Sequence, residues 1–154
     1  LRFDEEQRNG LKRAGMGARE PLGTEVCLHL YGQEHSPEIT PVMAKQEWAI
    51  GFDKYYIGSK ILKRQRDAGT ERVVVPFLLE GRQSARAGDV VRKDGADVGR
   101  VTSGVFLPSL GCSGGMMLID AIHAAAGTEL EVVLRKKSAP VRVADKPLYS
   151  KSKE

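Results

Sequence analysis

Residues 89–103 read DVVRKDGADVGRVTS, in which two short β-branched runs flank an Asp-Gly pair. The pair Asp94-Gly95 between two such runs is a strong signal for a β-hairpin, because a tight hairpin turn needs residues that tolerate positive φ. The sequence therefore predicts strands at residues 89–92 and 97–103, joined by a turn at Lys93-Asp94-Gly95.

Further short apolar runs follow Gly69 at the spacing expected of an all-β unit. They predict strands at residues 72–79, 116–122, 129–135 and 140–144, with Pro76 indicating an edge or a bulge. Met116 and Met117 are expected in the core. About six short strands must be closed or packed to protect their edges, so a small barrel or sandwich is the economical arrangement.

Residues before Gly69 have a different pattern, with helix-like segments between turns marked by glycine and proline. Thr40-Pro41 has the form of an N-cap followed by proline at the first helical position. Trp48, at the end of that helix, is expected in the core. Helices are predicted at residues 3–9, 17–28, from Thr40-Pro41 through Trp48, and 56–68. Pro21 is tolerated in the second of these only if it lies in the first turn.

The predicted fold is α+β. A helical segment occupies residues 1–69, an antiparallel β-barrel of about six strands occupies residues 70–149, and residues 150–154 form a polar tail. The chain begins at Leu1 rather than methionine, which indicates a fragment.

The composition excludes several classes of protein. The 154 residues are 41% hydrophobic and 29% charged, with no apolar run approaching the ~20 residues that span a bilayer. Cys27 and Cys112 have no CxxC spacing, and the three histidines show no ligand pattern, so neither a disulfide framework nor a metal site is expected. With a net charge of +4, a solvated basic surface is expected rather than nucleic-acid binding. A second use of the positive charge is the attraction of a small polyanion, such as a polyglutamyl tail.

An ordered series of motifs then identifies a family. Residues 10–19 read GLKRAGMGAR, residues 28–34 read LHLYGQE, residues 98–104 read VGRVTSG, and residues 108–111 read PSLG. Together with Thr40-Pro41, Trp48-Ala49-Ile50 and residues 54–58 (KYYIG), they resemble the folate-dependent aminomethyltransferases, which include the T-protein of the glycine cleavage system. The resemblance covers nearly the whole chain and corresponds to the C-terminal part of that family. It implies that residues 1–69 are the C-terminal end of the folate-binding aminomethyltransferase domain and that residues 70–149 are the C-terminal barrel domain.

The resemblance implies an activity, a cofactor and a partner. Family members transfer a one-carbon unit from an aminomethyl group on a lipoyl carrier protein (H-protein) to tetrahydrofolate, and ammonia is released. They hold tetrahydrofolate in a central channel, and the aspartate beside its reacting nitrogen lies upstream of the residues matched here. No catalytic residue is therefore expected in this chain, which by itself should be inactive. A cytoplasmic location is expected, or a mitochondrial one in a eukaryote, with neither nucleic acid nor membrane as partner.

Two residues in the first half match folate-binding positions of the family. Glu25 matches a glutamate that binds the pterin, and one carboxylate can accept hydrogen bonds from a ring N–H and the adjacent amino group. The alternative is a solvated helix glutamate. Lys54 matches a basic position beside folate, where a cation could pair with the carboxylates or the polar ring edge; the alternative is a surface lysine.

Two further residues match positions in the barrel. Arg86 matches an arginine in a turn, whose guanidinium could clamp a carboxylate or brace the loop through backbone carbonyls. Tyr149 matches an aromatic residue that ends the family's motif near folate. Its ring could stack on folate, its hydroxyl could form a hydrogen bond with folate, or the side chain could cap the barrel. Thr102 and Ser103 are not predicted to be nucleophiles, because no histidine or lysine stands at a recognisable triad spacing.

Three departures from the family pattern bear on the one-carbon donor. Gly23 replaces an arginine, Met43 a glutamate, and Cys112 a lysine. One alternative is a folate-dependent demethylase, or the C-terminal folate domain of an enzyme that oxidises dimethylglycine or sarcosine. A second is a non-catalytic folate-binding protein that assists iron–sulfur or RNA-modifying enzymes. That subgroup has a motif that contains a cysteine. The corresponding residues 53–60 contain no cysteine, which is evidence against this second alternative.

Overall fold

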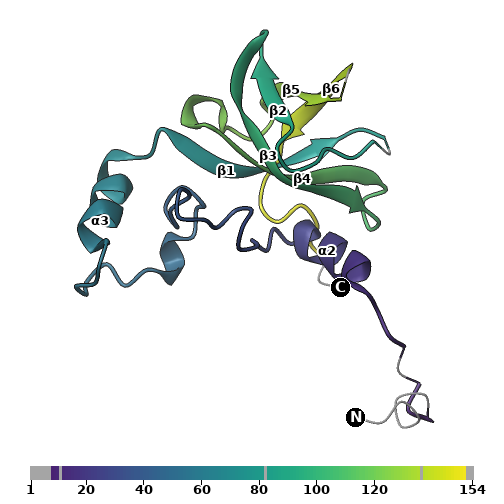
Figure 1. The fold of residues 1–154 in the computed structure, drawn as a ribbon, viewed down its shortest axis with the longest axis horizontal. Helices are drawn as coiled ribbons and strands as arrows, with labels where there is room; N and C mark the ends of the chain where they lie inside the picture. Colours follow the sequence, from purple (N-terminus) through teal and green to yellow (C-terminus); the bar gives the residue numbers. More distant parts are fainter. Residues whose placement is uncertain (1–7, 11, 82, 136, 152–154) are drawn as a thin grey trace.

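The fold is given by a computed structural model that describes residues 8–10, 12–81, 83–135 and 137–151. A helical half, residues 16–69, precedes a β-barrel and lies against one side of it (Figure 1). In chain order the elements are α2 (Met16–Glu25), the 3₁₀ turn η1 (Glu47–Ala49), α3 (Ser59–Ala68), β1 (Arg72–Leu79), β2 (Val90–Lys93), β3 (Ala96–Leu107), β4 (Cys112–Asp120), the 3₁₀ turn η2 (Ala121–His123), β5 (Glu129–Leu134) and β6 (Lys137–Val143).

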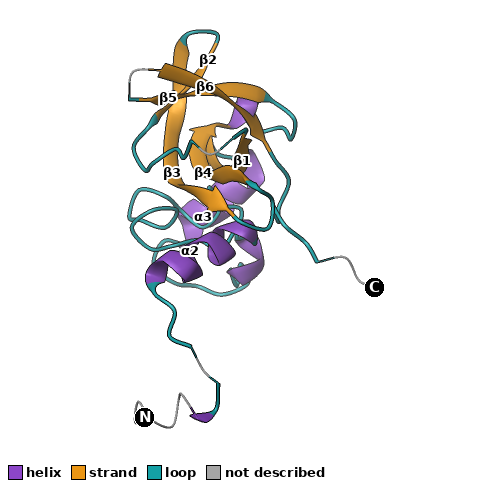
Figure 2. Cartoon of the chain, turned by 90° about the vertical axis from the view of Figure 1, so that its right-hand side faces the viewer, coloured by secondary structure: helices purple, strands orange, loops and turns teal. Residues whose placement is uncertain are grey.

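The strands form a closed antiparallel barrel in the order β1-β4-β3-β2-β5-β6, which confirms the predicted six-stranded barrel. Viewed at 90° to the first picture, the barrel lies above the layer formed by α2 and α3 (Figure 2). β1 is bounded by Arg72 and Leu79, as predicted. Pro76 precedes Phe77, the first residue at which β1 pairs with β6, so its missing N–H leaves no gap in that ladder.

The hairpin between β2 and β3 has the predicted turn. Asp94 and Gly95 have φ values of 51° and 84°, and Lys93 pairs with Ala96 across them. Positive φ at both central residues gives the turn a twist that matches the flanking strands.

Every second residue along the strands points into the barrel, and these side chains fill its interior. Val75, Phe77 and Leu79 of β1 point inward and are at most 2% exposed. They pack against inward residues of the other strands, which include Val91, Val101, Met117, Ile119, Leu130, Val132, Val141 and Val143. This continuous apolar core is what closing the sheet buries.

A second core lies outside the barrel, between β1, β4 and the helical half. Val74, Met116 and Leu118 point to the outer face of the sheet. There they pack against Cys27, Ile39 and Ala44 of the helical half. β1 and β4 are thus buried on both faces, which explains their unbroken apolar runs. Met116 and Met117 are 1% and 0% exposed, and their predicted burial is confirmed.

Helix α2 begins at Met16 and contains Pro21 in its second turn, although we expected proline to be tolerated only in the first turn. Proline has no N–H to donate to the carbonyl of Gly17, so the helix lacks one internal hydrogen bond. Contacts of α2 with β3 and β4 hold the helix in place despite this loss. The helix ends at Glu25, three residues earlier than predicted, and Cys27 follows with a positive φ of 55°.

The helix predicted from Thr40-Pro41 through Trp48 is wrong beyond its first turn. The Thr40 hydroxyl accepts a hydrogen bond from the Met43 N–H at 3.3 Å, as an N-cap does. Lys45 then adopts a φ of 53°, which ends the turn, and only the 3₁₀ turn η1 follows. Trp48 is 84% exposed, so its predicted place in the core is also wrong. The helix predicted at residues 3–9 lies, except for its last two residues, outside the described residues.

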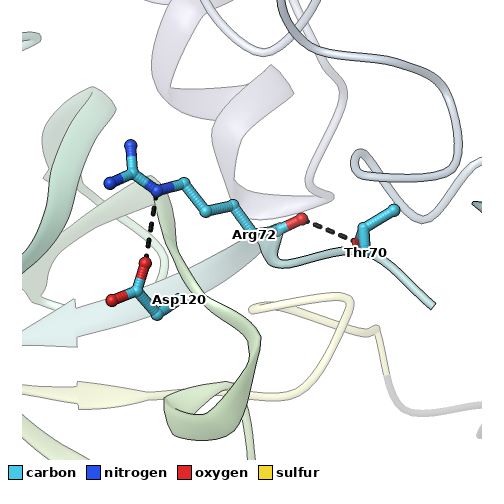
Figure 3. Close-up of polar contacts among 3 residues, drawn as sticks. All are labelled: Thr70, Arg72 and Asp120. Carbon is cyan, nitrogen blue, oxygen red and sulfur yellow. Dashed lines mark hydrogen bonds and ion pairs between the residues drawn. The ribbon is translucent and has the colours of Figure 1, made fainter.

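Helix α3 ends before Gly69, whose φ is 81°, as the sequence predicted. The connection to β1 is held by polar contacts (Figure 3). The Thr70 hydroxyl donates to the Arg72 carbonyl at 2.8 Å, and Nε of Arg72 donates to Asp120 at 3.2 Å. Asp120 ends β4, so these contacts fix the start of β1 against its neighbouring strand.

Candidate functional site

The Glu25 side chain joins the end of α2 to the barrel. Its Oε1 accepts a hydrogen bond from the Ser109 N–H at 2.8 Å, and its Oε2 accepts one from the Ser109 hydroxyl at 2.9 Å. Glu25 is 2% exposed, so the solvated glutamate considered above is excluded. A buried carboxylate requires such partners, and here both of its oxygens are hydrogen-bonded.

Tyr149 lies beside Glu25. Residues 144–149, which we call the C-terminal strap, leave the barrel after β6 and run back to the end of α2. The Tyr149 N–H donates to the Glu25 carbonyl at 2.8 Å, and Leu148 packs against the second core. The structure thus brings together two of the four predicted site residues, from positions far apart in the sequence.

Lys54 and Arg86 lie elsewhere. Lys54 is an exposed residue between η1 and α3, and Arg86 is an exposed residue in the loop between β1 and β2. In Figure 1 these two segments lie on opposite sides of the molecule. The Arg86 N–H donates to the Asp89 carboxylate at 2.7 Å, so that contact of the turn is made by backbone rather than by the guanidinium. Within the described residues, no hydrogen bond or ion pair joins either residue to Glu25 or Tyr149.

The strap also carries a polar cluster that the sequence did not predict. Lys146 Nζ lies 3.1 Å from His29 Nε2 and 3.3 Å from the Ala44 carbonyl, while the Gln46 amide lies 3.0 Å from His29 Nδ1. Burial and the nearby Lys146 charge lower the pKa of His29 to about 4, and burial lowers the pKa of Lys146. The ring is therefore neutral at pH 7, as acceptance of a hydrogen bond from an ammonium group requires.

Glu34 completes this cluster. Its Oε2 accepts a hydrogen bond from the Leu30 N–H at 3.0 Å, and the residue is 1% exposed. Its Oε1 is buried without a partner among the described residues. The Glu34 charge raises the pKa of Cys27 less than burial does, and it partly offsets the effect of Lys146 on His29.

Cavities on the described surface include one on the barrel and one beside α3. One, of about 380 Å³, lies over the ends of β1 and β6 and is lined by residues that include Leu78, Cys112 and Arg142. The other, of about 350 Å³, lies between α3 and the start of β1. Neither is lined by Glu25, Lys54, Arg86 or Tyr149.

The three departures from the family pattern have separate surroundings. A Cβ at Gly23 would meet only Leu28, at 4.0 Å, so there is room for a side chain. Met43 packs against the second core and its carbonyl accepts a hydrogen bond from the Val74 N–H at 2.8 Å. Cys112 begins β4 and lines the larger cavity, where burial raises the pKa of its thiol.

Nothing in the described ranges is a helix with the length and hydropathy needed to cross a membrane.

Comparison with known proteins identifies relatives along almost the whole chain. Residues 72–150 match the family model of the glycine cleavage T-protein C-terminal barrel domain. Aminomethyltransferases of Desulforamulus reducens, Natranaerobius thermophilus and Shouchella clausii are 37%, 39% and 41% identical over 93%, 95% and 94% of this chain. The chain spans 40% of the length of each of these relatives.

A solved structure shares the fold. The crystal structure of glycine cleavage system aminomethyltransferase T from Bartonella henselae superposes with a TM-score of 0.85 at 30% identity. The match covers 90% of this chain and 40% of that one. The barrel, the segments that precede it and the matched relatives agree, and the chain belongs to the glycine cleavage T-protein family, of which it represents the C-terminal part.

Proposed function

We propose that this chain is the C-terminal part of a tetrahydrofolate-dependent aminomethyltransferase. The full-length protein would transfer a one-carbon unit from the aminomethyl group on a lipoyl carrier protein to tetrahydrofolate, with release of ammonia. Membership of the family and the names of the relatives support this proposal. The single observation from the structure that supports it most is the buried carboxylate of Glu25 at the contact between α2 and the barrel.

Glu25 fits the recognition of a pterin ring. A carboxylate has about four lone-pair positions, and Ser109 occupies one on each oxygen. The remaining positions point away from each other, and one of them can accept a charge-assisted hydrogen bond from a ring N–H or from the amino group. Tetrahydrofolate, when bound, would supply the nitrogen that takes up the one-carbon unit.

The other three residues would have supporting roles. Tyr149, 36% exposed and joined to Glu25 through its backbone, would contact the ring by stacking or through its hydroxyl. Lys54 and Arg86 are exposed cations, which would attract the carboxylates of the folate tail from more distant positions. The net charge of +4 is favourable for this attraction.

This chain would contribute binding and orientation rather than the reacting groups. It spans 40% of the length of its relatives, and the aspartate that the family places beside the reacting nitrogen is expected in the remainder. The carrier protein would be the partner of the full-length enzyme, in the cytoplasm or, in a eukaryote, in mitochondria. We expect no turnover from this chain alone.

Calorimetric titration of tetrahydrofolate into the full-length protein tests the proposal. Glu25→Ala should weaken binding by about tenfold or more, because a charge-assisted hydrogen bond is lost. Glu20→Ala removes the same charge from the same helix and should bind like the wild type. Equal affinities for Glu25→Ala and the wild type would contradict the pterin role of Glu25.

A second experiment identifies the one-carbon donor. The full-length protein is incubated with tetrahydrofolate and with either the aminomethylated carrier protein, dimethylglycine or sarcosine. Release of ammonia with the carrier protein alone would identify the carrier protein as the donor.

A further inference from the structure

The C-terminal strap is held at both ends by backbone hydrogen bonds and in between by a side chain. At its start the Ala144 N–H donates to the Pro76 carbonyl at 2.9 Å, and at its end the Tyr149 N–H donates to the Glu25 carbonyl at 2.8 Å. The three residues that follow Ala144 are exposed. Among them, Lys146 provides a polar anchor to the helical half.

This anchor joins a charged amine to a neutral ring. Lys146 Nζ donates to His29 Nε2 at 3.1 Å and to the Ala44 carbonyl at 3.3 Å. His29 Nε2 accepts this bond only while it carries no proton, so the proton of the neutral ring is on Nδ1. The Gln46 amide faces Nδ1 at 3.0 Å, and its oxygen accepts this proton after a half-turn of the amide group.

The charged groups around the anchor determine its response to acid. Burial and the nearby charges of Lys146 and His35 lower the pKa of His29 to about 4, while the Glu34 charge acts against them. Lys146 is also close enough to feel the charges of Lys45 and Glu34. Protonation of His29 would remove the acceptor and place a second positive charge 3.1 Å from the ammonium group.

We propose that the C-terminal strap is an acid-sensitive clasp, which opens when His29 takes up a proton and repels Lys146. Opening also breaks the contact of Tyr149 with Glu25, so the response reaches the candidate site. In the open form His29 is in water, where the pKa of the ring returns to about 6.5. Acid therefore favours the open form as the pH falls from 6.5 towards 4, and the closed form is fully favoured above pH 7.

Cys27 can report the opening of the strap. It is 8% exposed and belongs to the second core, against which Leu148 of the strap packs. Burial raises the pKa of its thiol, and the Leu148 backbone and the Lys146 charge partly offset this rise, so the thiol lies beside the strap. Cys27 in turn acts on the pKa of Lys146. When closing is faster than labelling, the labelling rate of this thiol measures the population of the open form.

The test is thiol labelling of the full-length protein between pH 7 and pH 5, with 4,4′-dithiodipyridine as a reagent that reacts in acid. Mass spectrometry quantifies the labelled peptide that contains Cys27. His29→Gln is measured at each pH, because its amide oxygen can accept from Lys146 and takes up no proton. Dividing the wild-type rate by the variant's rate removes the pH dependence of the thiol reaction itself. This ratio should rise about tenfold from pH 7 to pH 5, which allows for the partial exposure of the ring.

Two further variants separate the anchor from its surroundings. His35→Gln is the matched control, because it makes the same substitution at a ring that lies 5.2 Å from that of His29. It should label like the wild type at every pH. Lys146→Met removes the anchor, so it should label severalfold faster than the wild type already at pH 7 and should respond less to acid.

Urea at about 1 M, below the unfolding transition, separates local opening from global unfolding. Opening the strap exposes little surface, so the labelling rate should hardly change, whereas access through global unfolding would accelerate steeply. A steep acceleration would overturn the clasp. A ratio of wild type to His29→Gln that stays constant from pH 7 to pH 5 would overturn it as well, and so would a wild-type labelling rate for Lys146→Met.

Discussion

The barrel and the helical half bury their apolar residues to very different degrees. Among the described residues, the large apolar side chains that are at least half exposed come from the barrel only at Ile122. The helical half contributes Met16, Leu22, Leu28, Tyr31, Trp48, Tyr55, Ile57 and Ile61. The barrel has a closed core of its own, whereas Cys27, Ile39 and Ala44 of the helical half are buried against the outer face of β1 and β4. We therefore expect the barrel to contribute most of the stability, while the helical half presents most of the exposed large apolar side chains.

Truncating the barrel core should give the largest loss of stability. Phe77 is 0% exposed at the centre of the barrel, and Phe77→Ala should lower the free energy of unfolding by about 3–5 kcal/mol. Trp48→Ala removes a side chain of similar size that is 84% exposed and should change it by less than about 0.5 kcal/mol. Urea unfolding of both variants gives the comparison, and similar losses would show that the two regions are equally well packed.

Adding a methyl group at a glycine should have opposite effects in the two regions. A Cβ at Gly115 would collide with the Ser103 carbonyl and approach the Gly104 Cα to 2.7 Å, so Gly115→Ala should destabilise the protein by about 1–3 kcal/mol. Gly23, within α2, has room, and Gly23→Ala should stabilise it by about 0.5–1 kcal/mol. Thermal unfolding measures both; a neutral Gly115→Ala would mean that β3 and β4 can separate locally.

Acid should destabilise the helical half before the barrel. The pKa of His29 is about 4 in the folded protein, against 6.5 for the free side chain, so the unfolded chain takes up the proton first. Stability should therefore fall as the pH drops from 6.5 towards 4, by about 1–2 kcal/mol for a partly exposed ring, and should not change from this cause above pH 7.

His29→Gln supplies the comparison for this effect. Its stability should depend less on pH between 6.5 and 4, because the group that takes up the proton is gone. Hydrogen exchange at pH 5 and pH 7 should show the loss of protection in residues 26–46 and in the strap. Equal pH dependence of the variant and the wild type would assign the effect to other groups.

Local signals predicted the barrel well. The ends of β1 were predicted to the residue, and Asp94-Gly95 gave the hairpin, because alternation and turn chemistry are encoded within a few residues. The exposure of Trp48 was not predicted, because a large aromatic residue in a short apolar run looks like a core residue in any sequence. Pro21 in the second turn of α2 was not predicted either, since tertiary contacts there outweigh helix propensity.

The site was predictable only in part, because its contacts join distant positions. Glu25 and Tyr149 were named from a resemblance, but their adjacency depends on the path of the strap around the barrel. No local pattern predicts the bond between Glu25 and Ser109, and none predicts the contact of Lys146 with His29, 117 residues away. Such pairs follow from the topology of the closed barrel rather than from spacing. The folate contacts of Lys54, Arg86, Glu25 and Tyr149 stay predictions.

The burial of β1 and β4 on both faces has a consequence for biosynthesis. Val74 and Val75 of β1 and residues Met116 to Ile119 of β4 present apolar side chains on both faces of the sheet, and such a surface promotes aggregation while it is exposed. Residues 26–46, which cover the outer face of these strands, leave the ribosome before them. The covering segment is thus already present when each strand emerges. This order of synthesis shortens the time during which the nascent chain exposes the apolar outer face of β1 and β4 to solvent.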